Sequence, residues 1–172
     1  LRALRPDLQP LDLRGNVNTR LAKLDAGAYD ALVLACAGVD RLGLGARIRA
    51  RLAPPQWLPA VGQGAIAIEC RAGDEAVQRL VGALDDAHTH RCVAAERAMN
   101  LSLHGSCNVP IAGWCIETET GLALWGLVGD AATGRLLRAE AQGADAQELG
   151  GHVASLLRDQ GAARMLAGLA RD

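Results

Sequence analysis

The cysteine best placed for chemistry lies in the segment LHGSCNVP, residues 103–110. The segment follows a run typical of a helix and precedes a run typical of a strand, so Cys107 is expected at an exposed corner. The thiolate is the reactive form of cysteine, and an ordinary pKa of about 8.5 needs only modest help to ionise. Gly105 and Ser106 leave the backbone room for a ligand, while Pro110 restricts the loop. The segment therefore predicts a covalent attachment point at Cys107.

The other four cysteines lie in apolar or alternating runs, where free cysteine is usually a small buried hydrophobic residue. They are Cys36, Cys70, Cys92 and Cys115. An odd total of five, without the spacing of a disulfide framework, indicates a reducing compartment, and we expect the cytoplasm.

A zinc site is an alternative for one group of ligand-type residues, namely His88, His90, Cys92, His104 and Cys107. Residues at positions i and i+2 of a helix face different ways, which separates the first three. No C-x-x-C pair is present to anchor a structural site. We therefore expect no metal.

Two arginines flank a predicted strand-to-helix turn in LRGNVNTR, residues 13–20. Amides at a helix N-terminus favour an anion, and the guanidinium groups of Arg14 and Arg20 can pair with carboxylate or phosphate through two bonds. An arginine in the first helical turn opposes the helix dipole, so stability alone would not select it. These residues predict an anion site, with two solvated surface arginines as the alternative.

A third arginine, Arg41, follows the predicted buried strand at residues 30–37. Open α/β sheets bind ligands beyond the carboxyl ends of their strands. Arg41 therefore either faces a ligand cleft or forms a surface ion pair with Asp40, and the sequence leaves both open.

The segment GQGAIA, residues 62–67, satisfies the G-x-G-x-x-A pattern. A dinucleotide site requires the glycines to follow a strand and open a helix. Here prolines precede the pattern and a strand is predicted after it, so we reject that site.

The elements that would position these residues divide into two groups. Residues 1–57 predict an α/β unit with parallel strands: a strand at 8–13, a helix capped by Asn18 or Thr19 and running to about Ala26, a buried strand at 30–37, and a helical segment at 41–52. A further strand at 61–70 is predicted to cross between two domains.

The character of the chain changes at Asp74, which is predicted to cap a helix. That helix has an apolar face at i, i+3, i+4 and i+7, formed by Val77, Leu80, Val81 and Leu84. A second helix at 89–101, strands at 111–117, 122–128 and 135–141, and a final helix broken at Gly161 follow. The pattern predicts a small α+β domain with a three-stranded antiparallel sheet.

Composition narrows the function. The chain has 172 residues, 50% hydrophobic and 22% charged, and a net charge of −1. Residues 1–51 hold nine Lys/Arg against five Asp/Glu, whereas the rest hold nine against fourteen, so the first part favours an anionic ligand. Basic residues form no runs and aromatic residues are few, which argues against nucleic-acid binding.

The longest apolar run, 31–39, is too short for a membrane span. Because the chain begins with Leu and has no signal-peptide pattern, we expect a fragment or a processed product.

Four segments occur in a specific order: LRGNVNTRLAKLDAGAYDALVLACAGVDRLGL, LPAVGQGAIAIEC, AAERAMN and GSCNVPIAG. Together they resemble the hydroxymethylbilane synthase, or porphobilinogen deaminase, family over essentially the whole chain. The resemblance implies three domains, the first two similar to the lobes of periplasmic binding proteins. Residues 1–57 would be the second half of domain 2, residues 58–72 a strand returning toward domain 1, and residues 73–172 domain 3, which carries the cofactor cysteine.

The resemblance also implies the chemistry. Cys107 would hold a dipyrromethane cofactor through a thioether, and four porphobilinogen molecules would be condensed head to tail onto it, with release of ammonia, to give hydroxymethylbilane. Arg14 and Arg20 would bind carboxylates of cofactor and substrate, and Arg41 would lie near the substrate. Less specific matches to cofactor neighbours are Gln63, Gly64 and Ala35.

The family's catalytic aspartate is expected in an N-terminal portion that this chain lacks. The chain alone is therefore expected to be inactive without that portion, and the whole enzyme to be a monomer. The alternative is a binding module of the periplasmic type that captures a small carboxylate without catalysis.

Overall fold

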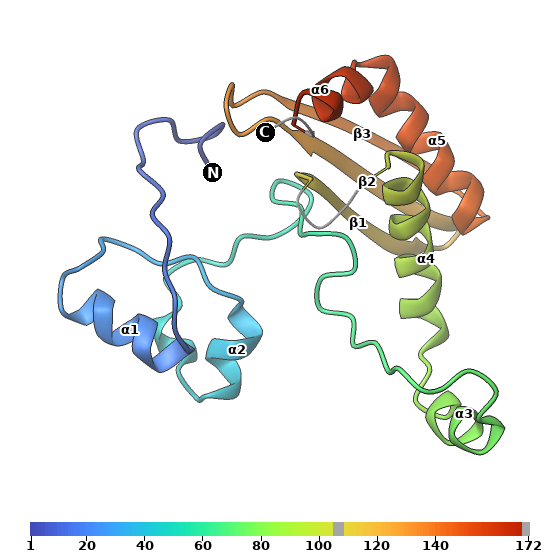
Figure 1. Ribbon diagram of the computed structural model, residues 1–172, viewed down its shortest axis with the longest axis horizontal. Helices are drawn as coiled ribbons and strands as arrows, with labels where there is room; N and C mark the ends of the chain where they lie inside the picture. The colour runs from blue at the N-terminus through green and yellow to red at the C-terminus, as the bar shows by residue number, and fades with distance from the viewer. Residues whose placement is uncertain (105–108, 170–172) are drawn as a thin grey trace. The chain divides into compact units, whose positions relative to one another are not determined.

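The computed structural model describes residues 1–104 and 109–169 of the chain (Figure 1). The predicted attachment point Cys107 lies outside the described residues. The chain divides into two compact units, Leu1–Ala53 and Pro54–Asp172, and each is considered by itself. Within the described residues, every helix is too short or too polar to cross a membrane.

The second unit is built on an antiparallel meander of three strands in the order β1-β2-β3. The strands are β1 (Ile111–Thr118), β2 (Gly121–Gly129) and β3 (Leu136–Gly143), which confirms the predicted sheet. Trp114 lies opposite Trp125 across the first ladder, with ring centroids 4.9 Å apart. Ile111, Gly113 and Cys115 are buried and alternate with half-buried residues, so β1 turns one face to the core.

Two helices cover that face, α4 (Ala87–Ser102) and α5 (Ala146–Asp159) (Figure 1). They approach closely at Gly150, where a Cβ atom would lie 2.5 Å from both the Ala95 carbonyl oxygen and the Ala98 Cβ. The core between helices and sheet includes Met99, Leu124, Val153 and Leu157, each fully buried. This core fixes the position of α4 relative to β1.

Helices α3 (Glu75–Gly82) and α6 (Ala162–Leu169) flank this core in the sequence. Asp74 caps α3 as predicted, since its side chain accepts a hydrogen bond from the Val77 amide at 3.2 Å. Three of the four residues of the predicted apolar face, Val77, Leu80 and Leu84, are nevertheless exposed, with Leu80 at 74%, whereas Val81 is half-buried. Gly161, with φ +102°, separates α5 from α6 and confirms the predicted break.

The first unit contains α1 (Val17–Asp25), α2 (Cys36–Arg41) and a short 3₁₀ helix, η1 (Gly45–Arg47). Its buried residues are Leu21 of α1 and Val39 of α2. Of the short helical segment predicted at 41–52, only η1 forms within that range, while α2 precedes it and ends at Arg41. The predicted cap of α1 is wrong: Asn16 caps the helix, in place of Asn18 or Thr19.

The strands predicted at 8–13, 30–37 and 61–70 do not form in the described part of the chain. Val33 is 67% exposed and Ile66 is 92% exposed, so neither run is buried as its composition predicts. A strand needs a hydrogen-bonded neighbour, and a parallel strand needs cover on both faces. No described segment supplies either, and the lobe of periplasmic-binding-protein type stays a prediction.

Candidate functional site

The turn before α1 contains Arg14, and Arg20 lies in the helix that follows it. Asn16 Oδ1 accepts hydrogen bonds from the amide and the hydroxyl of Thr19, both at 2.9 Å, and so fixes where the helix begins. Gly15 has φ +122°, and a Cβ there would lie 3.1 Å from Thr19 Cγ2, so the turn requires glycine. The predicted helix therefore forms, but it begins at Val17, earlier than a cap at Asn18 or Thr19 would place it.

Arg20 folds back over this turn. Its Nε donates to the Gly15 carbonyl oxygen at 2.7 Å. Arg20 is half-buried, and this hydrogen bond holds its guanidinium group against the backbone of the turn. The Arg14 side chain is exposed. Within the described residues, no carboxylate forms an ion pair with either arginine. The terminal guanidinium nitrogens of Arg14 and Arg20 can thus bind an external anion.

Arg41 and Ala35 flank α2, Arg41 as its last residue and Ala35 as its cap residue, and both are exposed. The alternative ion pair between Arg41 and Asp40 is wrong. Asp40 instead accepts two hydrogen bonds from Arg51 Nη2, at 3.0 and 2.9 Å. Arg41 therefore has no carboxylate partner among the described residues, like Arg14 and Arg20.

Gln63 and Gly64 lie in the second unit, in an exposed turn at residues 60–65. The Gln63 amide donates to the Ala60 carbonyl oxygen at 3.0 Å, and the Ala65 amide to that of Gly62 at 3.1 Å. Gly62 and Gly64 have φ values of +71° and +91°, which other residues rarely adopt. The next helix after this turn is α3, so the glycines do not open a helix as a dinucleotide motif requires.

A buried carboxylate holds the turn, and the sequence analysis missed it. Glu96 of α4 is only 6% exposed, and it accepts hydrogen bonds from the amides of Gly62 and Cys115, at 2.7 and 2.9 Å. Burial raises the pKa of Glu96, although the two amide hydrogen bonds act in the opposite direction. A signal was present: Glu96 lies between Cys92 and Met99 on the buried face of the helix.

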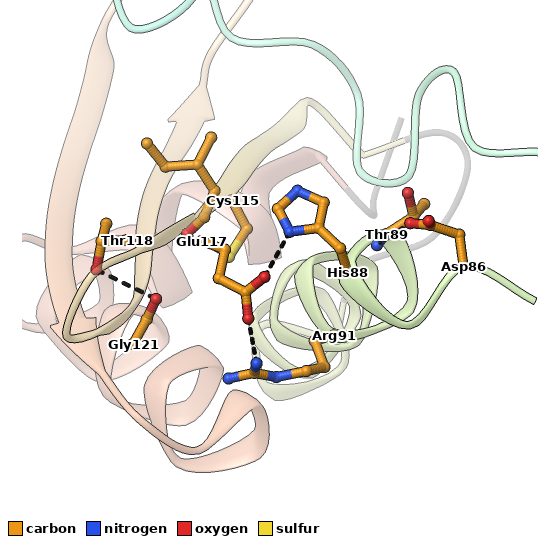
Figure 2. Close-up of polar contacts among 9 residues, drawn as sticks. Asp86, His88, Thr89, Arg91, Cys115, Glu117, Thr118 and Gly121 are labelled. Atoms are coloured by element: carbon orange, nitrogen blue, oxygen red, sulfur yellow. Dashed lines mark hydrogen bonds and ion pairs between the residues drawn. The ribbon is translucent and has the colours of Figure 1, made fainter.

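Two histidines of the zinc alternative, His88 and His90, pair with carboxylates instead. Figure 2 shows the contact of His88 with Glu117. His88 and Arg91 of α4 both contact Glu117 of β1, His88 through Nδ1 at 2.7 Å. His90 Nδ1 lies 3.2 Å from Asp85. Searched over the described residues, no three histidine, cysteine or acidic side chains are grouped to hold a metal ion.

The described cysteines differ in burial. Cys92 and Cys115 are buried, as predicted, whereas Cys36 and Cys70 are half-buried. Burial raises the pKa of Cys115 to about 12 and also raises that of Cys92, so neither thiol ionises readily near neutral pH. Cys92 and Cys115 are therefore poor candidates for covalent attachment, and the reactivity predicted for Cys107 stays a prediction.

Comparisons with known proteins agree on one family. Residues 1–79 match the model described as porphobilinogen deaminase, dipyromethane cofactor binding domain, and residues 90–159 match the model described as porphobilinogen deaminase, C-terminal domain. The chain is 58% identical over 171 residues to the porphobilinogen deaminase of Xanthomonas oryzae pv. oryzae (strain KACC10331 / KXO85), covering 98% of this chain and 56% of that protein. It is 61% identical over 168 residues to that of Stenotrophomonas maltophilia (strain K279a), covering 96% of this chain and 55% of that protein. The chain thus spans about half the length of the relatives it matches.

Proposed function

The chain belongs to the porphobilinogen deaminase family, and from that membership we propose that it forms part of a transferase of tetrapyrrole biosynthesis. The whole enzyme would condense four porphobilinogen molecules head to tail, with release of ammonia, to give hydroxymethylbilane. Its cofactor would be dipyrromethane, the group named for the domain that residues 1–79 match.

The observation that carries this proposal is that several arginines of the first unit have no aspartate or glutamate partner among the described residues. Arg47 and Arg51 are neutralised by Asp25 and Asp40, at 2.5 and 2.9 Å. Arg14, Arg20 and Arg41 have no such partner in the described part of the chain, and neither do Arg2 and Arg49. Unneutralised guanidinium groups are the donors that a ligand with several carboxylates requires, so the residues present fit a dipyrromethane with acid side arms.

Within this proposal Cys107 holds the cofactor covalently, and Gln63, Gly64 and Ala35 contact it. When bound, the cofactor supplies the pyrrole carbon to which porphobilinogen units are added. Arg14 and Arg20 bind carboxylates of cofactor and substrate, and Arg41 binds the substrate. Bidentate pairing of arginine with carboxylate fixes the orientation of a pyrrole ring and neutralises the charge of its acid side arm. Such positioning contributes on the order of several kcal/mol to lowering a reaction barrier.

The proposal extends to the parts of the fold. Residues 1–57 would complete a domain of periplasmic-binding-protein type, residues 58–72 would return to a first domain, and residues 73–172 would form the cofactor-cysteine domain. The exposed apolar runs at 30–37 and 61–70 would become strands beside residues that the longer relatives possess. The catalytic aspartate would also lie there, so this chain alone would be inactive, in a monomeric enzyme of the reducing cytoplasm.

A carboxylate-binding module without catalysis is not favoured, because both matching family models describe an enzyme family. The two functions also differ in a measurable product, since only the enzyme releases ammonia from porphobilinogen.

The test uses a hybrid enzyme, the Stenotrophomonas maltophilia porphobilinogen deaminase in which this chain replaces the segment it matches. We expect the hybrid enzyme to release ammonia from porphobilinogen, and Cys107→Ser to abolish this. Cys36→Ser is the matched control and should retain activity. A folded hybrid enzyme that binds porphobilinogen without releasing ammonia would contradict the proposal.

A further inference from the structure

We propose that Glu96 is a positioning residue, which fixes the turn at residues 60–65 against the edge of the sheet and so sets the place of Gln63 and Gly64. The proposal rests on the proposed function, since the cofactor contacts of those two residues come from it. It assigns to the AAERAMN segment a role in placing the cofactor contacts proposed for Gln63 and Gly64, although Glu96 itself is remote from solvent.

The argument begins at the free edge of β1. In the order β1-β2-β3, no strand of the described residues pairs with the other side of β1, and the amides on that side need other acceptors. The Gly113 amide donates to the Pro59 carbonyl oxygen at 3.0 Å, beside a single antiparallel bridge between Ala60 and Ala112. The next outward amide, that of Cys115, donates to Glu96 Oε1 at 2.9 Å. Pro59, in the segment before the turn, and the Glu96 carboxylate therefore accept hydrogen bonds from successive outward amides along the same edge of β1.

The second oxygen of the same carboxylate reaches the turn itself. Glu96 Oε2 accepts from the Gly62 amide at 2.7 Å, so one side chain joins α4, β1 and the turn. Hydrogen bonds to an ionised acceptor are roughly twice as strong as neutral ones. Gln63 directly follows Gly62 in the chain, so the hydrogen bond that holds the Gly62 amide also restricts the position of Gln63.

Packing on either side leaves the turn little freedom. A Cβ at Gly113 would lie 2.8 Å from Met99 Cε and 3.4 Å from Val61 Cγ2, so only glycine lets α4 and Val61 approach β1 this closely. Val61 packs against the core, while Gln63 and Gly64 are exposed. The turn is thus anchored at Val61 and Gly62 and presents its next two residues to the outside.

Packing alone would not select a carboxylate here. Burying a charge is costly unless hydrogen bonds compensate, and burial does raise the pKa of Glu96. An apolar residue would fill the space but leave two buried amides without acceptors. What the carboxylate adds is a fixed link between the turn and the sheet.

The first test is amide hydrogen exchange in the 172-residue chain. We expect the Gly62 and Cys115 amides to exchange at least about 100-fold more slowly than the Gly64 amide, which has no acceptor among the described residues. Glu96→Gln keeps the shape of the side chain but replaces one acceptor oxygen by an NH₂ group. The Gly62 or the Cys115 amide should therefore lose its protection from exchange, while the core amides of α5 keep theirs. Exchange of Gly62 as fast as that of Gly64 in the unsubstituted chain would overturn the proposal without any variant.

The second test measures the consequence in the hybrid enzyme. Glu96→Gln should lower kcat about 10- to 100-fold with KM within about twofold, because the turn positions a bound group rather than the incoming substrate. The exposed Glu119→Gln is the matched control and should change neither. Lost protection at Gly62 with unchanged kcat would overturn the positioning role but leave the proposed function intact. A folded hybrid enzyme that releases no ammonia would contradict the proposed function and leave the exchange result standing.

Discussion

Arg51 Nη2 lies 3.0 and 2.9 Å from the two carboxylate oxygens of Asp40, on the residue directly before Arg41. The pair is exposed and contributes little to stability, so its importance lies in which arginine it occupies. Because Asp40 is taken by Arg51, the charge of Arg41 stays available to an anion. The first prediction follows from this difference between neighbouring cations.

Arg41→Ala in the hybrid enzyme should lower kcat/KM for porphobilinogen about 10- to 100-fold, the loss of roughly 1.5–3 kcal/mol for hydrogen bonds to a charged group. Arg47→Ala is the matched control, because Asp25 already neutralises Arg47, and it should change kcat/KM less than about twofold. Steady-state ammonia release measures both. Equal losses in the two variants would mean that pairing within the unit does not distinguish functional arginines.

The contact of α4 with α5 predicts opposite effects at two adjacent glycines. Gly150→Ala should destabilise the chain by about 3 kcal/mol, because its Cβ would meet the Ala95 carbonyl oxygen at 2.5 Å. Gly151→Ala meets nothing within 4 Å and should stabilise by about 1 kcal/mol through helix propensity. Urea unfolding followed by circular dichroism gives both values. Effects of the same sign would show that the helices do not approach as described.

Glu117 predicts a pH-dependent part of stability. The His88 hydrogen bond, with the Arg91 charge, lowers the pKa of Glu117 in the folded state. A depressed carboxyl pKa stabilises the fold above the unfolded value of about 4.3, and this contribution is lost as pH falls through the folded value. Glu117→Gln should therefore destabilise the chain near about pH 6 and much less near about pH 3.

Urea unfolding at the two pH values measures the difference, with the exposed Glu119→Gln as the control that should show none. A destabilisation by Glu117→Gln that is larger at the lower pH would reverse the sign and contradict the described contacts.

The pKa of about 12 for Cys115 predicts a thiol that resists alkylation. Near about pH 8 its thiolate fraction is roughly 1,000-fold below that of an ordinary cysteine, so iodoacetamide should modify it correspondingly slowly. Half-buried Cys36 and Cys70 serve as internal references and should react first. Peptide mass spectrometry after timed labelling of the native chain gives the rates. Labelling of Cys115 as fast as Cys70 would refute its burial.

The fold was predictable where the sequence contains both sides of a contact. The three strands of the meander, the caps at Asp74 and the break at Gly161 depend on neighbours within 54–172, and all were predicted. The apolar runs at 30–37 and 61–70 were not placed correctly. Composition reports that a segment is suited to burial, but it does not report whether a partner strand is present to bury it.

The site was predictable for residues recognised by chemical type, and less so for residues that act through geometry. Arg14 and Arg20 were predicted around a turn from their spacing, and the Arg20 guanidinium does contact the Gly15 carbonyl oxygen of that turn. Glu96 was overlooked because a glutamate in a helix is ordinarily read as solvated. The pairing of Asp40 with Arg51 spans 11 positions in sequence, and no local pattern distinguishes it from pairing with Arg41.

The mass of the hybrid enzyme under denaturing conditions tests the central claim, that one sulfur atom carries the cofactor. The account predicts the added mass of one dipyrromethane, located by peptide mapping on Cys107 and lost in Cys107→Ser. An unmodified Cys107 in an enzyme that still releases ammonia from porphobilinogen would contradict it.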